Sequence, residues 1–377
     1  MNRVRAVAAA AVLVLSTIAI LPVAAATASG PTVIANIEVG VGSEPYFTHW
    51  LPGVDAFSVS DYGAGNVSFV GAENQTVYKN VTVQSEPAGQ ELLTPNGPAN
   101  QGNLLWVADR GSDNVSVINL TTYTVTHTIP VGVQPIGIAY DSANNTVWVA
   151  NWGGHNLTVL NATTYAHVRS VTVGTAPIYP YFDADTNTMA VADWTTGDFR
   201  LIGGSNYTTY DTVTGLNEPS AIASSEGPGS YHEFFVSDYG SHTTTVISHV
   251  TGQIVANISV GSDPYGDGWD NQTGDQFVAN SGGSTVSVVS AASNSVTATI
   301  TVGSHPYSAQ GYDARDGLIL VANYGSGNVS IISDSMGGSA AAAAAALTAS
   351  LLLIVIAVGL LAIVIAATSR MMGRRGA

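Results

Sequence analysis

The chain has 377 residues, no cysteine, and 10 basic against 26 acidic residues, which gives a formal net charge of −16 at pH 7. Without cysteine it has no disulfides, no thiol chemistry and no cysteine-ligated iron–sulfur sites. Its acidity disfavours nucleic acid and anionic lipid as partners, because both are bound through basic patches.

The first predicted element is a secretory signal peptide over residues 1–28. Arg3 and Arg5 precede an apolar run from Ala6 to Ala26, and Ala26-Thr27-Ala28 is a small-x-small cleavage site. An uncleaved N-terminal anchor is the alternative. With either interpretation, the body of the chain leaves the cytoplasm.

A repeat occupies most of the remaining chain. An apolar-x-Val-Ala/Ser motif ending in Asn or Asp occurs as Phe57–Asp61, Leu105–Asp109, Val147–Asn151, Met189–Asp193, Phe234–Asp238, Phe277–Asn280 and Ile319–Asn323. A Gly/Ser-rich turn ending in proline recurs, 42 to 48 residues apart, at Pro45, Pro87, Pro135, Pro177, Pro219, Pro264 and Pro306. The two motifs keep step along the chain, which indicates one structural unit per period.

One period contains four short segments rich in β-branched and aromatic residues: Ile136–Tyr140, Thr146–Ala150, Asn156–Leu160 and Val168–Val173. Asn, Asp, Gly and Ser separate them, as expected of tight turns. Four strands in a period of about 42 residues are typical of a propeller blade. The sequence therefore predicts an all-β, seven-bladed β-propeller over residues 29–334.

The N-terminal segment Thr32 to Val39 resembles the predicted outer strands Gln253–Val260 and Val296–Val302. The last repeat stops after its third strand, near Ile332, and has no outer strand of its own. We therefore expect the N-terminal strand to close the last blade and to protect two open sheet edges.

The copies resemble the YVTN-type β-propeller repeats of archaeal surface-layer and related exported proteins. Val147–Asn151, Asn156–Leu160, Val173-Gly174 and Pro177 carry the resemblance, which covers nearly all of the repeat region. It implies the propeller fold and a cell-surface role. It implies no reaction, because propellers carry unrelated functions.

The turns that carry the prolines and the turns after the Asn/Asp positions should lie on one face, since the strands of a blade alternate in direction. Aromatic residues beside acids or amides suit sugar rings or cationic groups. The candidate ligand-binding residues are therefore Tyr62, Trp152, Trp194, Tyr239 and Tyr324 together with Asp61, Asp109, Asp193 and Asp238. Arg110 and Ser281 interrupt the aromatic series, and Tyr46, Tyr265 and Tyr307 follow prolines. The alternative is structural: each Asn or Asp caps its own turn, and the rings seal the face.

No catalytic residue and no cofactor is predicted, and the metal content stays open. Two acidic groups, Asp183-Ala-Asp185-Thr-Asn187 and the set Asp263, Asp267, Asp270 and Asp275, lack the Gly and Glu of a calcium loop. The histidines have no metal-binding spacing. His49 and His305 could approach the axis, and the alternative is that they are isolated polar residues of strands and turns. Neither a Gly-x-Ser-x-Gly elbow nor a phosphate-binding loop is present.

The last predicted element is a transmembrane helix. Leu347 to Ala367 is 21 uncharged residues, enough at about 1.5 Å per residue to cross a hydrocarbon core of about 30 Å. Arg370, Arg374 and Arg375 follow it, so the positive-inside rule places the C-terminus in the cytoplasm. The predicted segments are a Gly/Ser/Ala stalk (335–346), the helix (347–368) and a basic tip (369–377).

The sequence thus predicts a membrane-anchored cell-surface propeller that acts as a binding or structural envelope protein. The expected partners are a cell-envelope glycan or protein, and surface-layer packing is a further option. Its outer domain has 5 basic against 26 acidic residues, a balance of −21, and twelve Asn-x-Ser/Thr sequons suit a glycoprotein. The alternatives are an exported metal-assisted hydrolase, lyase or lactonase and, less supported, a quinone-dependent dehydrogenase.

Overall fold

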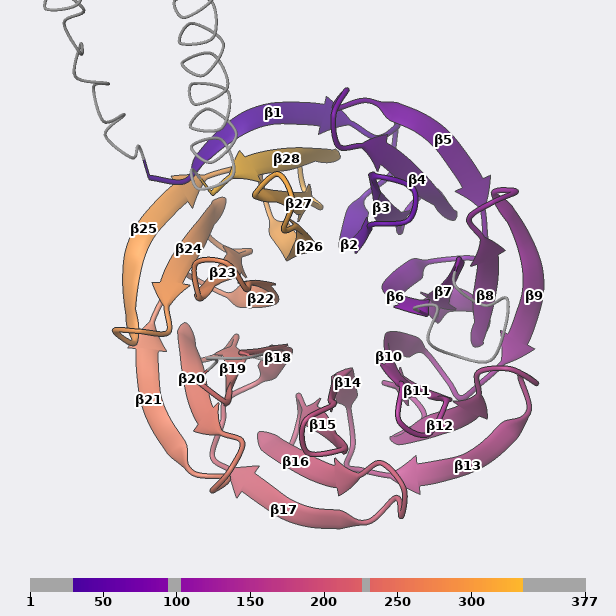
Figure 1. Ribbon diagram of the computed structural model, residues 1–377, viewed down its shortest axis with the longest axis vertical. Helices are drawn as coiled ribbons and strands as arrows, with labels where there is room; N and C mark the ends of the chain where they lie inside the picture. Colours follow the sequence, from indigo (N-terminus) through magenta and orange to yellow (C-terminus); the bar gives the residue numbers. More distant parts are fainter. Residues whose placement is uncertain (1–29, 94–102, 226–230, 335–377) are drawn as a thin grey trace, which may run out of the picture.

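The computed structural model describes residues 30–93, 103–225 and 231–334. These residues form seven antiparallel sheets of four strands each, arranged as blades around one axis (Figure 1). The predicted all-β, seven-bladed propeller is therefore confirmed. The four segments expected between Pro135 and Gly174 are all strands of one blade.

Each blade contributes one strand to each of four concentric rings. The innermost strands are β2 (Pro45–Leu51), β6 (Pro87–Leu93), β10 (Pro135–Asp141), β14 (Pro177–Asp183), β18 (Pro219–Ser224), β22 (Pro264–Asp270) and β26 (Pro306–Asp313). The second strands are β3 (Ala56–Asp61), β7 (Leu104–Asp109), β11 (Thr146–Asn151), β15 (Thr188–Asp193), β19 (Glu233–Asp238), β23 (Asp275–Asn280) and β27 (Leu318–Asn323). We number the blades 1 to 7 in this order.

The third strands are β4 (Asn66–Gly71), β8 (Asn114–Asn119), β12 (Asn156–Asn161), β16 (Asp198–Gly203), β20 (Thr243–Ser248), β24 (Thr285–Ser290) and β28 (Asn328–Ser333). The outer strands are β5 (Val77–Thr82), β9 (Thr124–Pro130), β13 (His167–Thr172), β17 (Thr209–Thr214), β21 (Ile254–Ser259), β25 (Ser295–Thr301) and, from the N-terminal end, β1 (Thr32–Glu38). A short 3₁₀ turn, η1 (Arg110–Ser112), follows β7.

The strand β1 closes the ring. It pairs antiparallel with β28, from Thr32 opposite Ser333 to Glu38 opposite Asn328, and so becomes the outer strand of blade 7 (Figure 1). The predicted closure is confirmed. Segments from the two ends of the described chain thereby share one sheet, which leaves no blade short of a strand.

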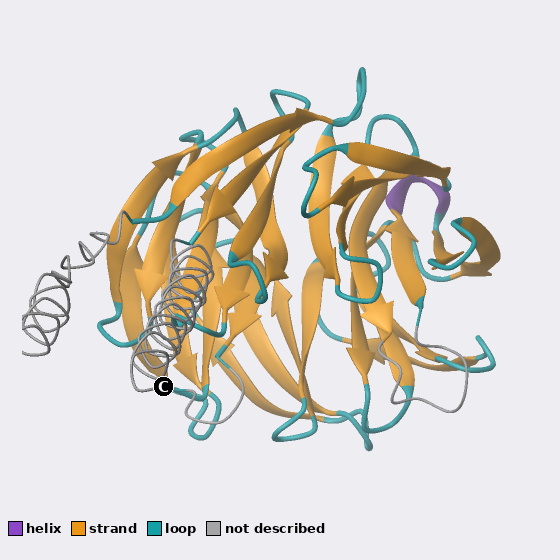
Figure 2. Ribbon diagram, turned by 45° about the horizontal axis from the view of Figure 1, so that its top comes forward, coloured by secondary structure: helices purple, strands orange, loops and turns teal. Residues whose placement is uncertain are grey.

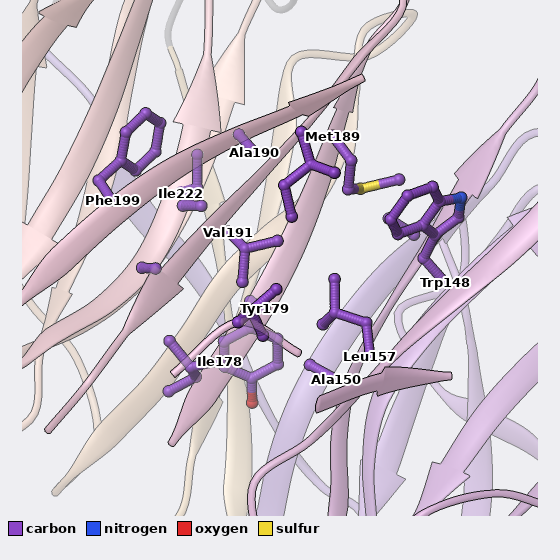
Figure 3. Packing of buried hydrophobic residues seen from close by; sticks show 14 of the residues in the cluster. Trp148, Ala150, Leu157, Ile178, Tyr179, Met189, Ala190, Val191, Phe199 and Ile222 are labelled. Carbon is purple, nitrogen blue, oxygen red and sulfur yellow. The ribbon is translucent and has the colours of Figure 1, made fainter. Parts of the chain in front are cut away.

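The core lies between neighbouring blades. All six residues of β3, β7, β11 and β15 are buried, because both faces of a second strand are covered by other blades. Figure 3 shows Trp148 of blade 3 directed toward Met189 of blade 4, with Leu157 and Val191 in the same cluster. This two-sided burial explains why the repeat motif reads as an apolar run and not as strict alternation.

The innermost strands all begin at a proline at one end of the axis, and we call that end the proline face. Before six of these prolines the backbone turns through a left-handed residue, for example Glu44 at φ 46° and Glu218 at φ 53°. The carbonyl of this residue accepts the backbone N–H that follows the second strand, as in Tyr239 N–H to Glu218 O at 3.1 Å. The two turn types are therefore fixed side by side on this face, as the sequence predicts. Figure 2 shows the strands running between the two faces.

The predicted signal peptide, stalk and transmembrane segment lie outside the described residues. Within the ranges that the structure describes, no helix is both long and apolar enough to span a membrane. The membrane anchor and its orientation therefore stay predictions.

Candidate ligand-binding site

A cavity of about 320 Å³ opens at the centre of the proline face. Its lining comes from six blades: Tyr46, Tyr62, Arg110, Ile136, Trp152, Trp194, Tyr265, Tyr307 and Tyr324. Tyr239 of the remaining blade packs on Trp194, with ring centroids 5.0 Å apart. We call these residues, apart from Tyr46, the aromatic bowl. All five aromatic residues predicted from the repeat belong to it.

In six of the seven blades the backbone positions one bowl residue in the same way, and in blade 6 the equivalent residue is Ser281. The N–H groups of Tyr62, Trp152, Trp194 and Tyr324 bond to the carbonyl before the proline turn of their own blade, at 2.9 to 3.3 Å. Each ring therefore starts from an equivalent point beside the axis. Arg110 takes the same place in blade 2, which explains how a charged residue enters an aromatic series.

The rings contact one another without filling the bowl. Tyr265, Tyr307 and Tyr324 stack in sequence, with centroid distances of 4.6 and 4.7 Å. Trp152 and Trp194 meet at 5.7 Å in a tilted arrangement. All five side chains are half-buried, so each keeps part of its surface open to a ligand.

Carboxylates hold the phenol groups on one side of the bowl. Arg110 Nη1 donates to the Tyr62 hydroxyl at 2.7 Å, and that hydroxyl donates to Glu86 Oε2 at 2.8 Å. The Tyr324 hydroxyl donates to Glu44 Oε2 at 3.0 Å. Arg110 lies 4.0 Å from Glu86, so its charge is balanced within the site.

Two more acids border the bowl near Tyr239. Burial raises the pKa of the Tyr239 hydroxyl, and the negative charges of Asp263 and Glu218 raise it further. Glu218 is exposed and Asp263 is partly exposed, and each directly precedes a proline, as Glu44 and Glu86 do. The rim of the aromatic bowl is therefore acidic.

A plug of rings closes the axis beneath the bowl. Phe47 of blade 1 and Tyr179 of blade 4 stack across the axis at 5.5 Å, and the Tyr46 and Tyr265 hydroxyls lie 2.6 Å apart. Tyr46, Phe47 and Tyr179 are 5 to 7 % exposed. Burial raises the pKa of Tyr46, Tyr179 and Tyr265 well above the usual phenol value, which keeps these groups neutral.

The four predicted aspartates lie beneath the surface of the proline face. Asp61, Asp109, Asp193 and Asp238 are at most 2 % exposed. Three of them accept a hydroxyl hydrogen bond from the third strand of their blade: Asp61 from Ser68 at 2.5 Å, Asp109 from Ser116 at 2.7 Å, and Asp238 from Thr245. Asp193 instead accepts backbone N–H bonds from Ala176, Thr195 and Thr196, at 2.9 to 3.1 Å. These side chains tie strands and turns together, so we assign contact with a ligand to the rings above them.

A second cavity, of about 370 Å³, lies on the other side of the plug, and we call it the lower cavity. Its lining includes His49, Glu91, Asp267 and Gln310, and also Phe47 and Tyr179 of the plug. Of the two histidines that could approach the axis, His49 lines this cavity and His305 does not. Burial lowers its pKa to about 4 and raises the pKa of Glu91 to about 8, so both are uncharged near neutral pH.

The acidic groups considered as metal sites act in turns and between strands. Asp183 accepts N–H from Asp185 at 3.0 Å, Asp270 accepts N–H from Gln272 at 2.8 Å, and Asp267 accepts the Ser237 hydroxyl at 2.5 Å. Within the described ranges no group of three or more His, Cys, Asp or Glu side chains is arranged to hold a metal ion.

Neither a protein-family model nor a curated protein matches the sequence. A similar solved structure is a chain of hydrazine synthase from Kuenenia stuttgartiensis, with 18% sequence identity and a TM-score of 0.65. The match covers 77% of this chain and 95% of that chain. It shows the fold alone. The resemblance to YVTN-type repeats and surface-layer proteins therefore stays a prediction.

The sequence analysis missed the acids of the bowl rim and the members of the plug. A signal for the acids is visible in the repeat: Glu44, Glu86, Glu218 and Asp263 all stand one residue before a repeat proline. The plug has a signal too. Phe47 and Tyr179 both stand two residues after a repeat proline, where the other blades have the small residues Gly89, Gly137, Ala221, Gly266 and Ser308.

Proposed function

We propose that the chain is a cell-surface binding protein whose aromatic bowl recognises a carbohydrate. The observation that carries this proposal is the bowl itself: half-exposed rings from five blades surround one cavity with an acidic rim, and Tyr239 of a sixth blade packs against them. Large rings at solvent-facing turns have no role in the turn, and grouped apolar surface usually marks an interaction site.

The chemistry of the bowl suits a neutral or amino sugar. The C–H faces of a sugar stack on aromatic rings, while its hydroxyls bond to phenols and carboxylates, each contact contributing about 1 kcal/mol. Several such contacts support millimolar to micromolar affinity after the cost of association. Glu44 and Glu86 disfavour acidic sugars by charge repulsion. Arg110 does not offset this repulsion, because its guanidinium is already bound to Tyr62 beside Glu86.

The plug weakens the alternative that the bowl rings only seal the propeller. Tyr46, Phe47 and Tyr179 already close the axis and are nearly fully buried. The rings above them, such as Trp152 and Trp194, keep exposed surface. Sealing is thus assigned to the plug, which leaves the outer rings for recognition.

Replacing Trp152 and Trp194 by alanine tests this assignment. We expect each substitution to weaken binding to a recognised glycan about tenfold or more. We expect the melting temperature to change by only a few degrees, because these rings are half-exposed. Tyr78→Ala is the matched control: Tyr78 is 44% exposed on an outer strand, so its loss should leave binding unchanged. A large fall in melting temperature with no ligand found would favour the seal.

The cell-surface part of the proposal rests on the two ends of the sequence, and protease accessibility tests it. Protease added to intact cells should digest the propeller and spare a tag at the C-terminus, because the positive-inside rule keeps that end in the cytoplasm. A tag that is degraded in unbroken cells would contradict this topology.

A further inference from the structure

Blade 5 departs from the repeat at two positions that face each other. Ser224 pairs with Phe234, and in the other six blades the equivalent position of the innermost strand holds a large side chain: Trp50, Leu92, Tyr140, Phe182, Trp269 and Tyr312. His249 follows the third strand, where the other blades have Ala72, Leu120, Ala162, Gly204, Ala291 and Asp334, each with the same backbone N–H bond. Compared with the other blades, blade 5 has a small serine in place of a large side chain at residue 224 and a histidine ring at residue 249.

The two exchanged side chains meet a carboxylate from the preceding blade, blade 4. Ser224 Oγ lies 3.1 Å from His249 Nε2, and His249 Nδ1 lies 3.1 Å from Asp183 Oδ2. The histidine and aspartate side chains are 2% and 1% exposed. The Phe234 ring stacks on the imidazole at 3.7 Å, and Thr186 donates to Asp183 at 2.6 Å, so the ring and the carboxylate are both held in place.

The balance of charge on Asp183 fits a carboxylate that orients a histidine. Its burial opposes ionisation, but the interactions with His249 and Thr186 outweigh this effect and lower its pKa. The group is therefore an anion near neutral pH. His249 Nδ1 contacts the Asp183 carboxylate at 3.1 Å without the alignment of a hydrogen bond, and its Nε2 faces the Ser224 hydroxyl. The order serine, imidazole, carboxylate is that of a nucleophile–base–orienter set.

The serine also has access to a substrate-sized space. Ser224 lines the lower cavity of about 370 Å³, beside Ile222, Ala223 and Trp269. Ser224 is 2% exposed, so only a small part of it reaches the cavity, and Trp269, its equivalent in blade 6, lines the same cavity. Apolar side chains and uncharged polar groups dominate this lining, which favours an uncharged substrate.

We propose that Ser224, His249 and Asp183 form an acyl-transfer centre that hydrolyses an uncharged ester of a short-chain acid bound in the lower cavity. Ser224 Oγ attacks the ester carbonyl and transfers its proton to His249 Nε2. His249 returns that proton to the leaving alcohol as the ester bond breaks. Water then attacks the acyl-serine with His249 as base, which releases the acid and restores the serine.

Space filling alone accounts for the sizes of the two exchanged residues and not for their bonding. A ring at residue 249 occupies room that a large side chain at residue 224 would take. An apolar ring at residue 249 would fill this space equally well. It gives no reason for a hydroxyl on one imidazole nitrogen and a buried carboxylate on the other.

A fluorophosphonate probe tests the proposal on the purified full chain, since an activated serine displaces fluoride and forms an Oγ–P bond. Peptide mass spectrometry should locate one adduct, on Ser224. Ser224→Ala should abolish it, and His249→Gln and Asp183→Asn should slow labelling about 100-fold or more. Ser225→Ala is the matched control, because Ser225 is the next residue and bonds only to the backbone of Glu233.

Melting curves show whether each variant is folded. Ser224→Ala and Ser225→Ala should each lower the melting temperature by only a few degrees, since each loses one buried hydroxyl. Absence of labelling of the folded, unaltered chain would overturn the proposal. So would an adduct that persists in Ser224→Ala. Neither result would bear on the carbohydrate proposal for the aromatic bowl, because the plug separates the two cavities.

Discussion

Deletion of Thr32–Glu38, with the leader kept, should lower the melting temperature of the propeller by about 10 °C or more. The strand β1 pairs along the length of β28, and its inward residues Val33, Ala35 and Ile37 pack on the cores of blade 7 and its neighbours. Losing these side chains and the ladder bonds costs about 5 kcal/mol or more, out of a typical stability of about 5 to 15 kcal/mol. Differential scanning calorimetry measures the change.

The control for this deletion is a substitution on the outward face of the same strand. Ile34 is 47% exposed, so Ile34→Thr should leave the melting temperature within about 2 °C. Supplying β1 as a separate peptide should restore part of the lost stability by strand addition to the open edge of β28. If the deleted chain melted with the intact one, the closure of the ring by β1 would not contribute to stability.

The second large effect concerns pH and the buried aspartates of the proline face. Burial raises the pKa of Asp61, Asp109 and Asp238 from the ordinary 3.8 to about 7. Between these values the folded chain binds more protons than the unfolded chain, so the free energy of unfolding falls as pH rises from about 4 to about 7. Melting temperatures should therefore be higher at pH 4.5 than at pH 8.

Replacing these three aspartates by asparagine should raise the free energy of unfolding at pH 8 by about 1 to 3 kcal/mol per site and flatten its pH dependence. Three other blades already have asparagine at this position. The amides of Asn151, Asn280 and Asn323 donate to Thr158, Ser287 and Ser330 at 2.9 to 3.0 Å. Denaturant unfolding at the two pH values measures both effects.

Asp193→Asn is the matched control and should have the opposite sign. Both carboxylate oxygens of Asp193 accept backbone N–H bonds, and an amide can replace only one of them. The remaining N–H would be buried without a partner, which costs about 1 to 3 kcal/mol. Equal destabilisation by all four substitutions would contradict the account of the pH dependence.

The fold was predictable because its information is local and repeated. Prolines and Asn/Asp positions recur in step, and each blade satisfies the same hydrogen bonds. The closing strand was predictable for the same reason, since Thr32–Glu38 has the composition of an outer strand. The sequence did not distinguish surface from interior at Asp61 and its equivalents, because an aspartate at the end of a strand can face either solvent or the third strand.

The site was predictable only where it follows the repeat. Five rings come one residue after the Asn/Asp positions, so their place on one face follows from strand direction. The plug follows from the repeat only in part. Phe47 and Tyr179 occupy the same position, two residues after the proline, but their contact across the axis depends on ring size and side-chain direction. The contact of Ser224 with His249 and Asp183 was also missed, since it joins two blades and matches no spacing within either.

An array of immobilised glycans, probed with the full chain and with the Trp152→Ala/Trp194→Ala variant, tests the central proposal most directly. The account predicts that neutral or amino sugars bind, that acidic sugars do not, and that the variant loses the signal while remaining folded. Binding of the folded variant equal to that of the unaltered chain, or no binding to any neutral or amino sugar, would contradict it.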